Sequence, residues 1–212
     1  TVLSASRMTE YAYTWLSPTL IAEWKAGEPL DDVIRRLAPL QNDGVDSHRP
    51  SLFATRKDHG KVGTRRCFVF ANGDYNRDGD YEDKHAGDLP DLEQEGKDLR
   101  DCYRSHDYQT ELHENLNDDG MLETMQRALS QAKSGDELVF HYAGHGMHGG
   151  MLGTTSTWGH VIPAADMVFN SELQELVVKA REKGIKLVLI SDACYSGHTT
   201  DYLRHYQIKG ME

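Results

Sequence analysis

Two short stretches of this chain each end an apolar run with a side chain that can take part in covalent chemistry. Residues 140–146 read Phe-His-Tyr-Ala-Gly-His-Gly and present His145 between two glycines. Residues 187–197 read Leu-Val-Leu-Ile-Ser-Asp-Ala-Cys-Tyr-Ser-Gly and present Cys194. A thiol and an imidazole at the ends of neighbouring strands can act as a nucleophile and its acid/base partner. We therefore predict that Cys194 attacks a carbonyl carbon and that His145 protonates the leaving group.

Each of these side chains also has a simpler interpretation. Most free cysteines behave as small buried hydrophobic residues, and a loop histidine can lack any special role. A further alternative takes His141, His145 and His148 as zinc ligands, although no cysteine pair or acidic ligand stands nearby. The catalytic interpretation is favoured because Cys194 lies between a strand end and Ser-Gly, where a side chain is exposed. In addition, the glycines beside His145 let a substrate approach closely.

Alternating strands and helices must position this pair. From residue 67 onward, short apolar runs alternate with amphipathic segments, which predicts a parallel sheet covered on both faces. In such sheets, sites form beyond the carboxyl ends of the strands, where His145 and Cys194 both lie. The expected strands are residues 67–71, 108–113, 138–140 and 187–190, and the expected helices are residues 91–104, 121–133 and 171–184. The last helix is expected to open with a capping box, Ser171-x-x-Gln174.

The front of the chain has a different pattern. Residues 1–6 predict a short strand, and a second brief strand is expected over residues 49–55, after a proline. Between them, two amphipathic helices are expected over residues 15–24 and 30–40. Residues 56–66 are charged and contain two glycines, so they are expected to form a linker.

Composition limits the class of protein and its partners. The chain has 212 residues and a formal net charge of −11, and that length fits one α/β domain with a sizeable core. An acidic surface repels nucleic-acid phosphates and anionic lipids, so we expect neither as a partner, whereas cationic peptides are tolerated or attracted. No apolar stretch approaches the roughly 18 residues of a membrane span, and no signal peptide is recognisable. The three cysteines form no disulfide or metal pattern, which favours a reducing, cytoplasmic location, with Cys67 and Cys102 as packing residues.

The two motifs together carry a family resemblance. Residues 142–146, Tyr-Ala-Gly-His-Gly, match the Tyr-Ser-Gly-His-Gly of the caspase-like cysteine peptidases. Residues 192–197, Asp-Ala-Cys-Tyr-Ser-Gly, match the Asp-x-Cys-x-Ser-Gly of their metacaspase and orthocaspase branch. The His-to-Cys separation of about 50 residues is also that of caspases. The resemblance implies a three-layer α/β/α fold with a mostly parallel six-stranded sheet, and an endopeptidase with a Cys-His dyad and a thioester acyl-enzyme.

The order of the segments departs from that family. Its large subunit, which residues 67–212 resemble, normally precedes a small subunit made of a strand, two helices and a Pro-led strand. Residues 1–55 have that small-subunit order. We interpret the chain as a single caspase-like domain, residues 1–212, that is circularly permuted and joined through residues 56–66. The alternative is an unrelated helical appendage. The permutation, whether natural or engineered, predicts activity without a processing cut.

The resemblance also assigns the residues around the substrate. It implies an oxyanion hole made by the backbone N–H groups of Gly146 and Cys194. Asp192 stands where caspases have Gln, and in metacaspases this Asp lines the specificity pocket, which implies cleavage after Arg or Lys. Glu95 takes the place of their second pocket acid, although the alternative is a solvated helix face. Ser6 is expected to border the same pocket.

A calcium site is the remaining candidate. Residues 74–80 read Asp-Tyr-Asn-Arg-Asp-Gly-Asp, the start of a calcium-binding loop. The twelfth position of the loop is His85 instead of the bidentate Glu, so a flexible acidic loop is the favoured interpretation. The calcium ligands in the alternative would be Asp74, Asn76, Asp78 and Asp80.

We therefore expect a monomeric cysteine endopeptidase that requires no cofactor and acts on proteins or peptides with a basic P1 residue. The alternative from another class is a catalytically idle caspase-fold module that binds or regulates, tuned by calcium. The presence of His145, Cys194, Gly146 and Asp192 together favours the enzyme, because an idle module has no reason to keep all four.

Overall fold

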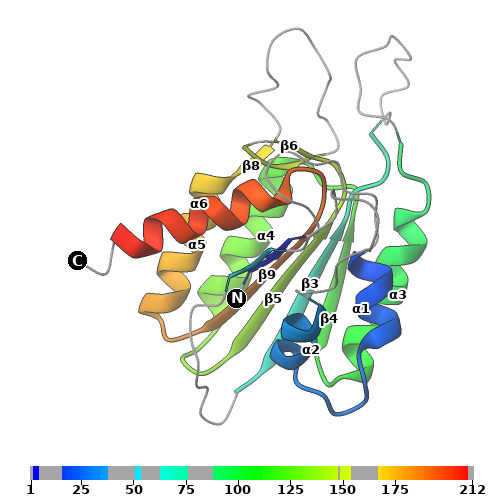
Figure 1. Cartoon of the computed structure of the whole chain (residues 1–212), viewed down its shortest axis with the longest axis horizontal. Coiled ribbons are helices and arrows are strands. Elements are labelled where there is room, and N and C mark those ends of the chain that lie inside the picture. The colour runs from blue at the N-terminus through cyan, green and yellow to red at the C-terminus, as the bar shows by residue number, and fades with distance from the viewer. Residues whose placement is uncertain are drawn as a thin grey trace, which may run out of the picture.

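A six-stranded sheet forms the centre of the protein in the computed structural model, which describes residues 2–4, 16–37, 51–53, 63–75, 88–147, 149–153 and 167–209. The strand order is β2-β1-β9-β5-β3-β4 (Figure 1). All neighbours are parallel except β1 and β2, which are antiparallel. The strands are β1 Val2–Ser4, β2 Ser51–Phe53, β3 Arg65–Ala71, β4 Gln109–Glu114, β5 Glu137–Ala143 and β9 Lys186–Asp192.

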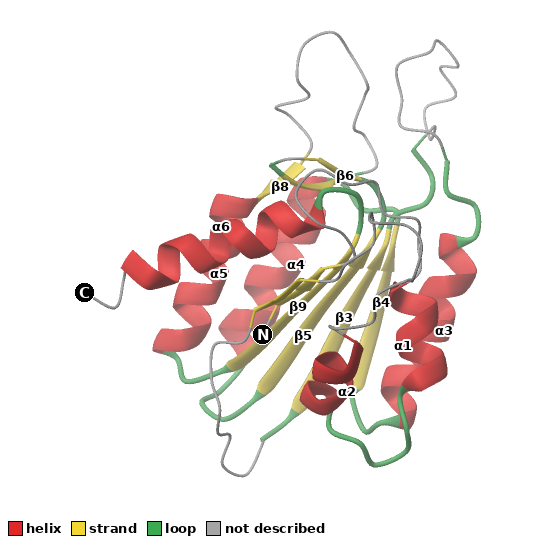
Figure 2. Ribbon diagram, viewed as in Figure 1, coloured by secondary structure: helices red, strands yellow, loops and turns green. Residues whose placement is uncertain are grey.

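Helices cover both faces of this sheet (Figures 1 and 2). One face carries α4 (Asp118–Gln131), α5 (Asn170–Glu182) and α6 (Ser196–Lys209), whose apolar residues share a core with the strands. The other carries α1 (Leu16–Glu23), α2 (Leu30–Leu37) and α3 (Leu92–Ser105), with a second core. The predicted three-layer α/β/α architecture is confirmed.

The two cores follow from the period-two alternation of side chains along each buried strand. In β3, Phe68 and Phe70 enter the core beneath α4 and α5, while Cys67 and Val69 enter the core beneath α1, α2 and α3. Burial raises the pKa of the Cys67 thiol well above its usual value, so this cysteine is a packing residue, as predicted. The strands between the helical layers are apolar on both faces, which is why their sequences are near-continuous apolar runs.

The front of the chain is built into the same sheet and the same core. β1 lies beside β9, with Leu3 opposite Ile190, and β2 continues the sheet beyond β1 (Figure 1). Helices α1 and α2 contribute Leu16, Leu20, Val33 and Ile34 to the core that also holds Val188 and Ile190. This shared core argues against an unrelated appendage. Whether the order is permuted relative to the family stays a prediction.

An ion network anchors α2 to the amino ends of the central strands. The Lys186 ammonium lies 2.7 Å from Asp31 of α2 and 3.1 Å from the nearly inaccessible Glu137 of β5. The Tyr108 hydroxyl donates a hydrogen bond of 2.5 Å to the same Glu137 carboxylate.

Several boundaries differ from the sequence expectations. β3 begins at Arg65, so the last two residues of the expected linker pair with β5, and residues 56–62 lie outside the described residues. The capping box expected at Ser171 and Gln174 is wrong: α5 begins at Asn170, and the Phe169 N–H donates to Glu172.

Two elements were not predicted. These are α6 and a small antiparallel sheet of β6 (Gly146–Met147), β7 (Gly150–Leu152) and β8 (Met167–Phe169). Among the helices of the described residues, none combines the length and the apolarity needed to cross a membrane.

Candidate active site

The predicted pair lies beyond the carboxyl ends of the two central strands. β5 and β9 are in parallel register, with Ala143 opposite Asp192, and the Gly144 N–H donates to the Asp192 carbonyl at 3.3 Å. His145 and Cys194 each follow two residues after this last register pair. The sheet therefore delivers both to one place, as the strand pattern predicted.

Gly146 lies against the backbone of the Cys194 turn. A side-chain carbon at position 146 would overlap the Cys194 carbonyl oxygen and would stand 3.0 Å from the Cβ of Ala193. Only glycine allows this approach. The two backbone N–H groups expected to form the oxyanion hole thus belong to adjacent segments, and their role stays a prediction.

Cys194 lies in a tight turn between β9 and α6. The residue forms no disulfide bond and is partly exposed. The next residue, Tyr195, has a φ of 55°, a backbone conformation that costs a non-glycine residue energy and that concentrates at functional sites. Helix α6 begins at Ser196, and the amino end of a helix favours negative charge such as a thiolate.

Two tyrosine hydroxyls fix the backbone of His145. The Tyr75 oxygen accepts the His145 N–H at 2.8 Å, and the Tyr142 hydroxyl donates to the His145 carbonyl at 2.6 Å. The two hydroxyls are 3.3 Å apart, and the ring of Tyr75 lies 4.7 Å from the imidazole. Sequence reasoning missed Tyr75, because it lies in the stretch considered only for calcium.

The two expected pocket acids lie close enough to affect each other's charge. Asp192, fully buried at the end of β9, accepts the Ser17 N–H at 2.8 Å and the Ser17 hydroxyl at 2.9 Å on the same oxygen, Oδ2. Glu95 of α3 lies near enough to this pair that Ser17 lowers its pKa while the charge of Asp192 raises it. Burial, and then the charge of Asp192, raise the pKa of Glu95 to about 7. The structure thus brings the two acids together, and their contact with substrate stays a prediction.

A buried histidine continues this cluster into the core. The Nε2 of His141 is 3.1 Å from the Ser17 hydroxyl, and its Nδ1 is 2.9 Å from the Tyr103 hydroxyl. Burial lowers the pKa of His141 to about 3, so the ring is neutral at ordinary pH. Both ring nitrogens are engaged, so His141 is not a zinc ligand and that alternative is wrong.

Ser17, His141 and Tyr103 were not predicted. His141 is a polar side chain inside the apolar run of residues 138–143, and a buried polar side chain needs hydrogen-bond partners. This was the one feature of the sequence that indicated such partners.

Several predicted residues cannot be placed. Ser6, Asn76, Asp78, Asp80 and His148 lie outside the described residues. Asp74 is described, and its backbone N–H donates to Asn115 at 2.9 Å. Within the described part of the chain, no cluster of three or more His, Cys, Asp or Glu side chains is arranged to hold a metal ion.

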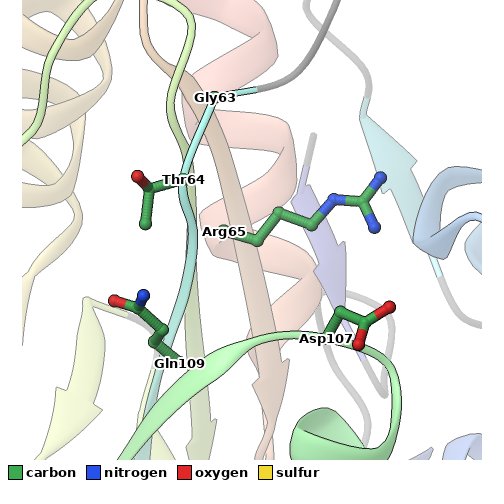
Figure 3. Close-up of a pocket in the computed structure, with 5 residues that line it drawn as sticks. All are labelled: Gly63, Thr64, Arg65, Asp107 and Gln109. Carbon is green, nitrogen blue, oxygen red and sulfur yellow. The ribbon is translucent and has the colours of Figure 1, made fainter.

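A separate pocket of about 470 Å³ opens at the amino ends of β3 and β4, the opposite end of the sheet from Cys194. Figure 3 shows its lining residues, Gly63, Thr64, Arg65, Asp107 and Gln109. The lining contains neither Cys194 nor His145, so this pocket is not the predicted active site.

Comparisons with known proteins agree with this geometry. The chain is 32% identical over 98 residues to Metacaspase-1 of Schizosaccharomyces pombe, a match covering 43% of this chain and 23% of that protein. It is 30% identical to Metacaspase-1 of Saccharomyces cerevisiae and to Metacaspase-1A of Aspergillus niger, over 43% of this chain and 23% and 24% of theirs. The matches therefore span about a quarter of each relative.

A family model matches more of the chain than these relatives do. The caspase-domain model covers residues 64–209, which is more than half of the sequence and includes both His145 and Cys194. The chain belongs to the caspase-domain family of cysteine peptidases.

Proposed function

We propose that this protein is an endopeptidase that cleaves after Arg or Lys, with Cys194 as nucleophile and His145 as acid/base. The observation that carries the proposal is the common placement of these two residues beyond the paired ends of β5 and β9. The family assignment supports the reaction class, and the acid pair Asp192 and Glu95 beside the nucleophile turn supports the specificity.

The reaction follows from the chemistry of the pair. The thiolate of Cys194 attacks the carbonyl carbon, the backbone N–H groups of Gly146 and Cys194 stabilise the oxyanion, and the peptide C–N bond breaks. His145 gives a proton to the leaving amine, which departs. Water then hydrolyses the thioester, releasing the carboxylate and restoring the thiol.

Specificity follows from charge. A buried carboxylate without a cation is costly, whereas a guanidinium or ammonium group compensates it with charge-assisted hydrogen bonds. Glu95 is half-buried and Asp192 is fully buried, so Glu95 is the acid nearer to solvent. An acidic P1 side chain would be repelled by the same pocket.

A panel of fluorogenic peptides that differ only at P1 tests the proposal. We expect turnover with Arg and Lys, and little with Asp or with citrulline, the neutral isostere of Arg. Cys194→Ala should abolish turnover, while Cys102→Ala, which removes the half-buried thiol on α3, should retain it. Asp192→Asn should lower kcat/KM for Arg peptides at least about 30-fold, since losing one partner of a buried charge pair costs about 2 kcal/mol or more.

Each outcome has a defined meaning. Asp-selective turnover contradicts the pocket assignment. No turnover by freshly reduced protein, with and without calcium, would favour the binding or regulatory module instead. Activity that persists in Cys194→Ala would mean that the thiol chemistry is not located at Cys194.

The remaining expectations belong to the same proposal. We propose a permuted small-subunit part at the front of the chain, a basic peptide or protein substrate, no required cofactor, a monomer and a cytoplasmic location. The placement of β1 beside β9 supports the first of these. Turnover that persists in a chelator would support the absence of a calcium requirement.

A further inference from the structure

A chain of hydrogen bonds runs through the interior of the protein to the carboxylate of Asp192. The Tyr103 hydroxyl lies 2.9 Å from Nδ1 of His141, and Nε2 of the same ring lies 3.1 Å from the Ser17 hydroxyl oxygen. The Ser17 hydroxyl donates to Oδ2 of Asp192 at 2.9 Å. All four side chains are fully buried, where a polar group that loses its partner is costly.

The sheet and α1 bring these side chains together. His141 of β5 lies opposite Ile190 of β9, and Asp192 is two residues further along β9. Because side chains alternate along a strand, His141 and Asp192 are diagonal neighbours on one face of the sheet. Ser17, in the first turn of α1, contacts both of them and so bridges the two strands.

Hydrogen-bonding capacity gives the chain one direction. A serine hydroxyl has a single proton, and Ser17 uses it on Asp192. Its oxygen can then only accept from His141, so Nε2 carries a proton. Burial lowers the pKa of His141 to about 3, which agrees with a neutral ring whose Nδ1 accepts the Tyr103 hydroxyl proton. The donors therefore point from Tyr103 through His141 and Ser17 to Asp192.

Ser17 directs two donors at one oxygen of Asp192. Its backbone N–H lies 2.8 Å from Oδ2, the oxygen that also receives the hydroxyl proton. The N–H groups in the first turn of a helix have no partner inside the helix, so this donor is available to the carboxylate. Two hydrogen bonds from one residue fix the rotation of the carboxylate about its Cβ–Cγ bond.

We propose that Ser17 and His141 are positioning residues for specificity, which hold the Asp192 carboxylate in the orientation that meets a P1 cation. The Nε2–H group of His141 fixes the Ser17 hydroxyl so that its proton points to Asp192. Ser17 lies outside residues 64–209, the part that the caspase-domain model matches, so by this proposal the front of the chain takes part in selecting the substrate. The inference rests on the proposed Arg/Lys specificity.

The orientation of a carboxylate matters more for binding Arg than for binding Lys. A guanidinium group is planar and its N–H donors have fixed directions, whereas the donors of an ammonium group rotate freely. A carboxylate that can rotate therefore keeps most of its attraction for Lys but loses the matched geometry for Arg. General damage to the fold, by contrast, would lower the cleavage of both substrates alike.

Two fluorogenic peptides that differ only in Arg or Lys at P1 test the proposal on the intact chain. Ser17→Ala should lower kcat/KM about tenfold for Arg and less than about threefold for Lys, because a hydrogen bond to a charged group is lost. Ser17→Thr keeps the hydroxyl and should retain the Arg-to-Lys ratio of kcat/KM. A ratio that is unchanged in Ser17→Ala would overturn the proposal.

Two substitutions of His141 form a matched pair. Glutamine places its amide nitrogen close to the position of Nε2 and can still donate to Ser17, whereas the shorter asparagine ends near the position of Nδ1. We expect the Arg-to-Lys ratio of kcat/KM to be retained in His141→Gln and to fall about fivefold in His141→Asn. Equal ratios in the two variants would overturn the positioning role of His141.

A second measurement separates this inference from the specificity on which it rests. Nitrogen-15 NMR of the histidine rings, assigned with His141→Gln, shows which ring nitrogen of His141 carries the proton. We expect the proton on Nε2 at neutral pH. With that result and a wild type that cleaves neither peptide, the proposed function fails while the positioning of Asp192 stands. A proton on Nδ1 would overturn the positioning, whatever the peptides show.

Discussion

The position of the His145 imidazole depends on two hydroxyls that hold its backbone. The Tyr75 oxygen accepts the His145 N–H, and the Tyr142 hydroxyl donates to its carbonyl. Tyr142 lies in β5, three residues before the histidine, whereas Tyr75 follows β3, so the clamp joins two separate segments. The proposed acid/base group is therefore positioned in part from outside its own loop.

Replacing Tyr75 with Phe should slow catalysis without weakening substrate binding. The ring stays against the imidazole, but the acceptor for the His145 N–H is lost, which costs about 1 kcal/mol. We expect kcat for an Arg-P1 peptide to fall about fivefold, with KM nearly unchanged. Tyr108→Phe removes a hydroxyl at the opposite end of the sheet and should leave kcat as it is. An unchanged kcat in Tyr75→Phe would contradict the clamp.

At the scale of elements, α2 is attached to the sheet by the ion network around Lys186. Its ammonium joins Asp31 of α2 to Glu137 of β5, and Glu137 is almost without exposure. A buried charge that loses its partner destabilises a fold far more than an exposed pair does.

Lys186→Met should lower the free energy of unfolding by about 3 kcal/mol, because it leaves Glu137 buried without its cation. Urea denaturation followed by circular dichroism measures the change. The matched control is Lys179→Met on α5, whose exposed pair with Glu175 at 3.7 Å should contribute less than about 0.5 kcal/mol. Similar losses in both variants would count against an anchoring role for Lys186.

The helices and strands that were predicted well are those whose own sequence pattern is enough to indicate their secondary structure. Residues 138–140 and 187–190 are apolar on both faces, as buried strands are, and Asn117 caps α4 by accepting the Gly120 N–H. Helix α6 opens with Ser-Gly-His-Thr-Thr-Asp, poor helix formers, and is held by packing through residues such as Leu203. The capping box predicted at Ser171 is wrong because the helix begins one residue earlier. Glu172 is then the side chain that accepts a backbone N–H, that of Phe169.

The site was predictable only in part, for the same reason. His145 and Cys194 carry a local motif, and the parallel register of their strands follows from the strand pattern. Ser17 and His141 are 124 residues apart in the sequence. The residues around each of them give no indication that the two side chains are in contact. Polar contacts of this kind are set by tertiary packing.

At the scale of the whole molecule, the segment that contacts Asp192 precedes the catalytic strands. We expect the intact chain to hydrolyse Arg-P1 peptides without internal cleavage, because Ser17 of α1 contacts Asp192 in the uncut chain. Turnover measured alongside mass spectrometry of the same sample checks this expectation. An intact chain that is inert and gains activity only on cleavage would contradict it. A Cys194→Ala sample should remain intact and inactive.

The contact between Ser17 and Asp192 joins residues 175 positions apart. Contacts of such separation form late, because almost all of the intervening chain must first be ordered. While the protein is being synthesised, α1 leaves the ribosome long before β9 exists to receive it. A nascent chain at that stage lacks Cys194, the proposed nucleophile, and Asp192, the proposed pocket acid. If the proposed function is correct, the order of synthesis therefore prevents cleavage of neighbouring polypeptides before β9 has been made.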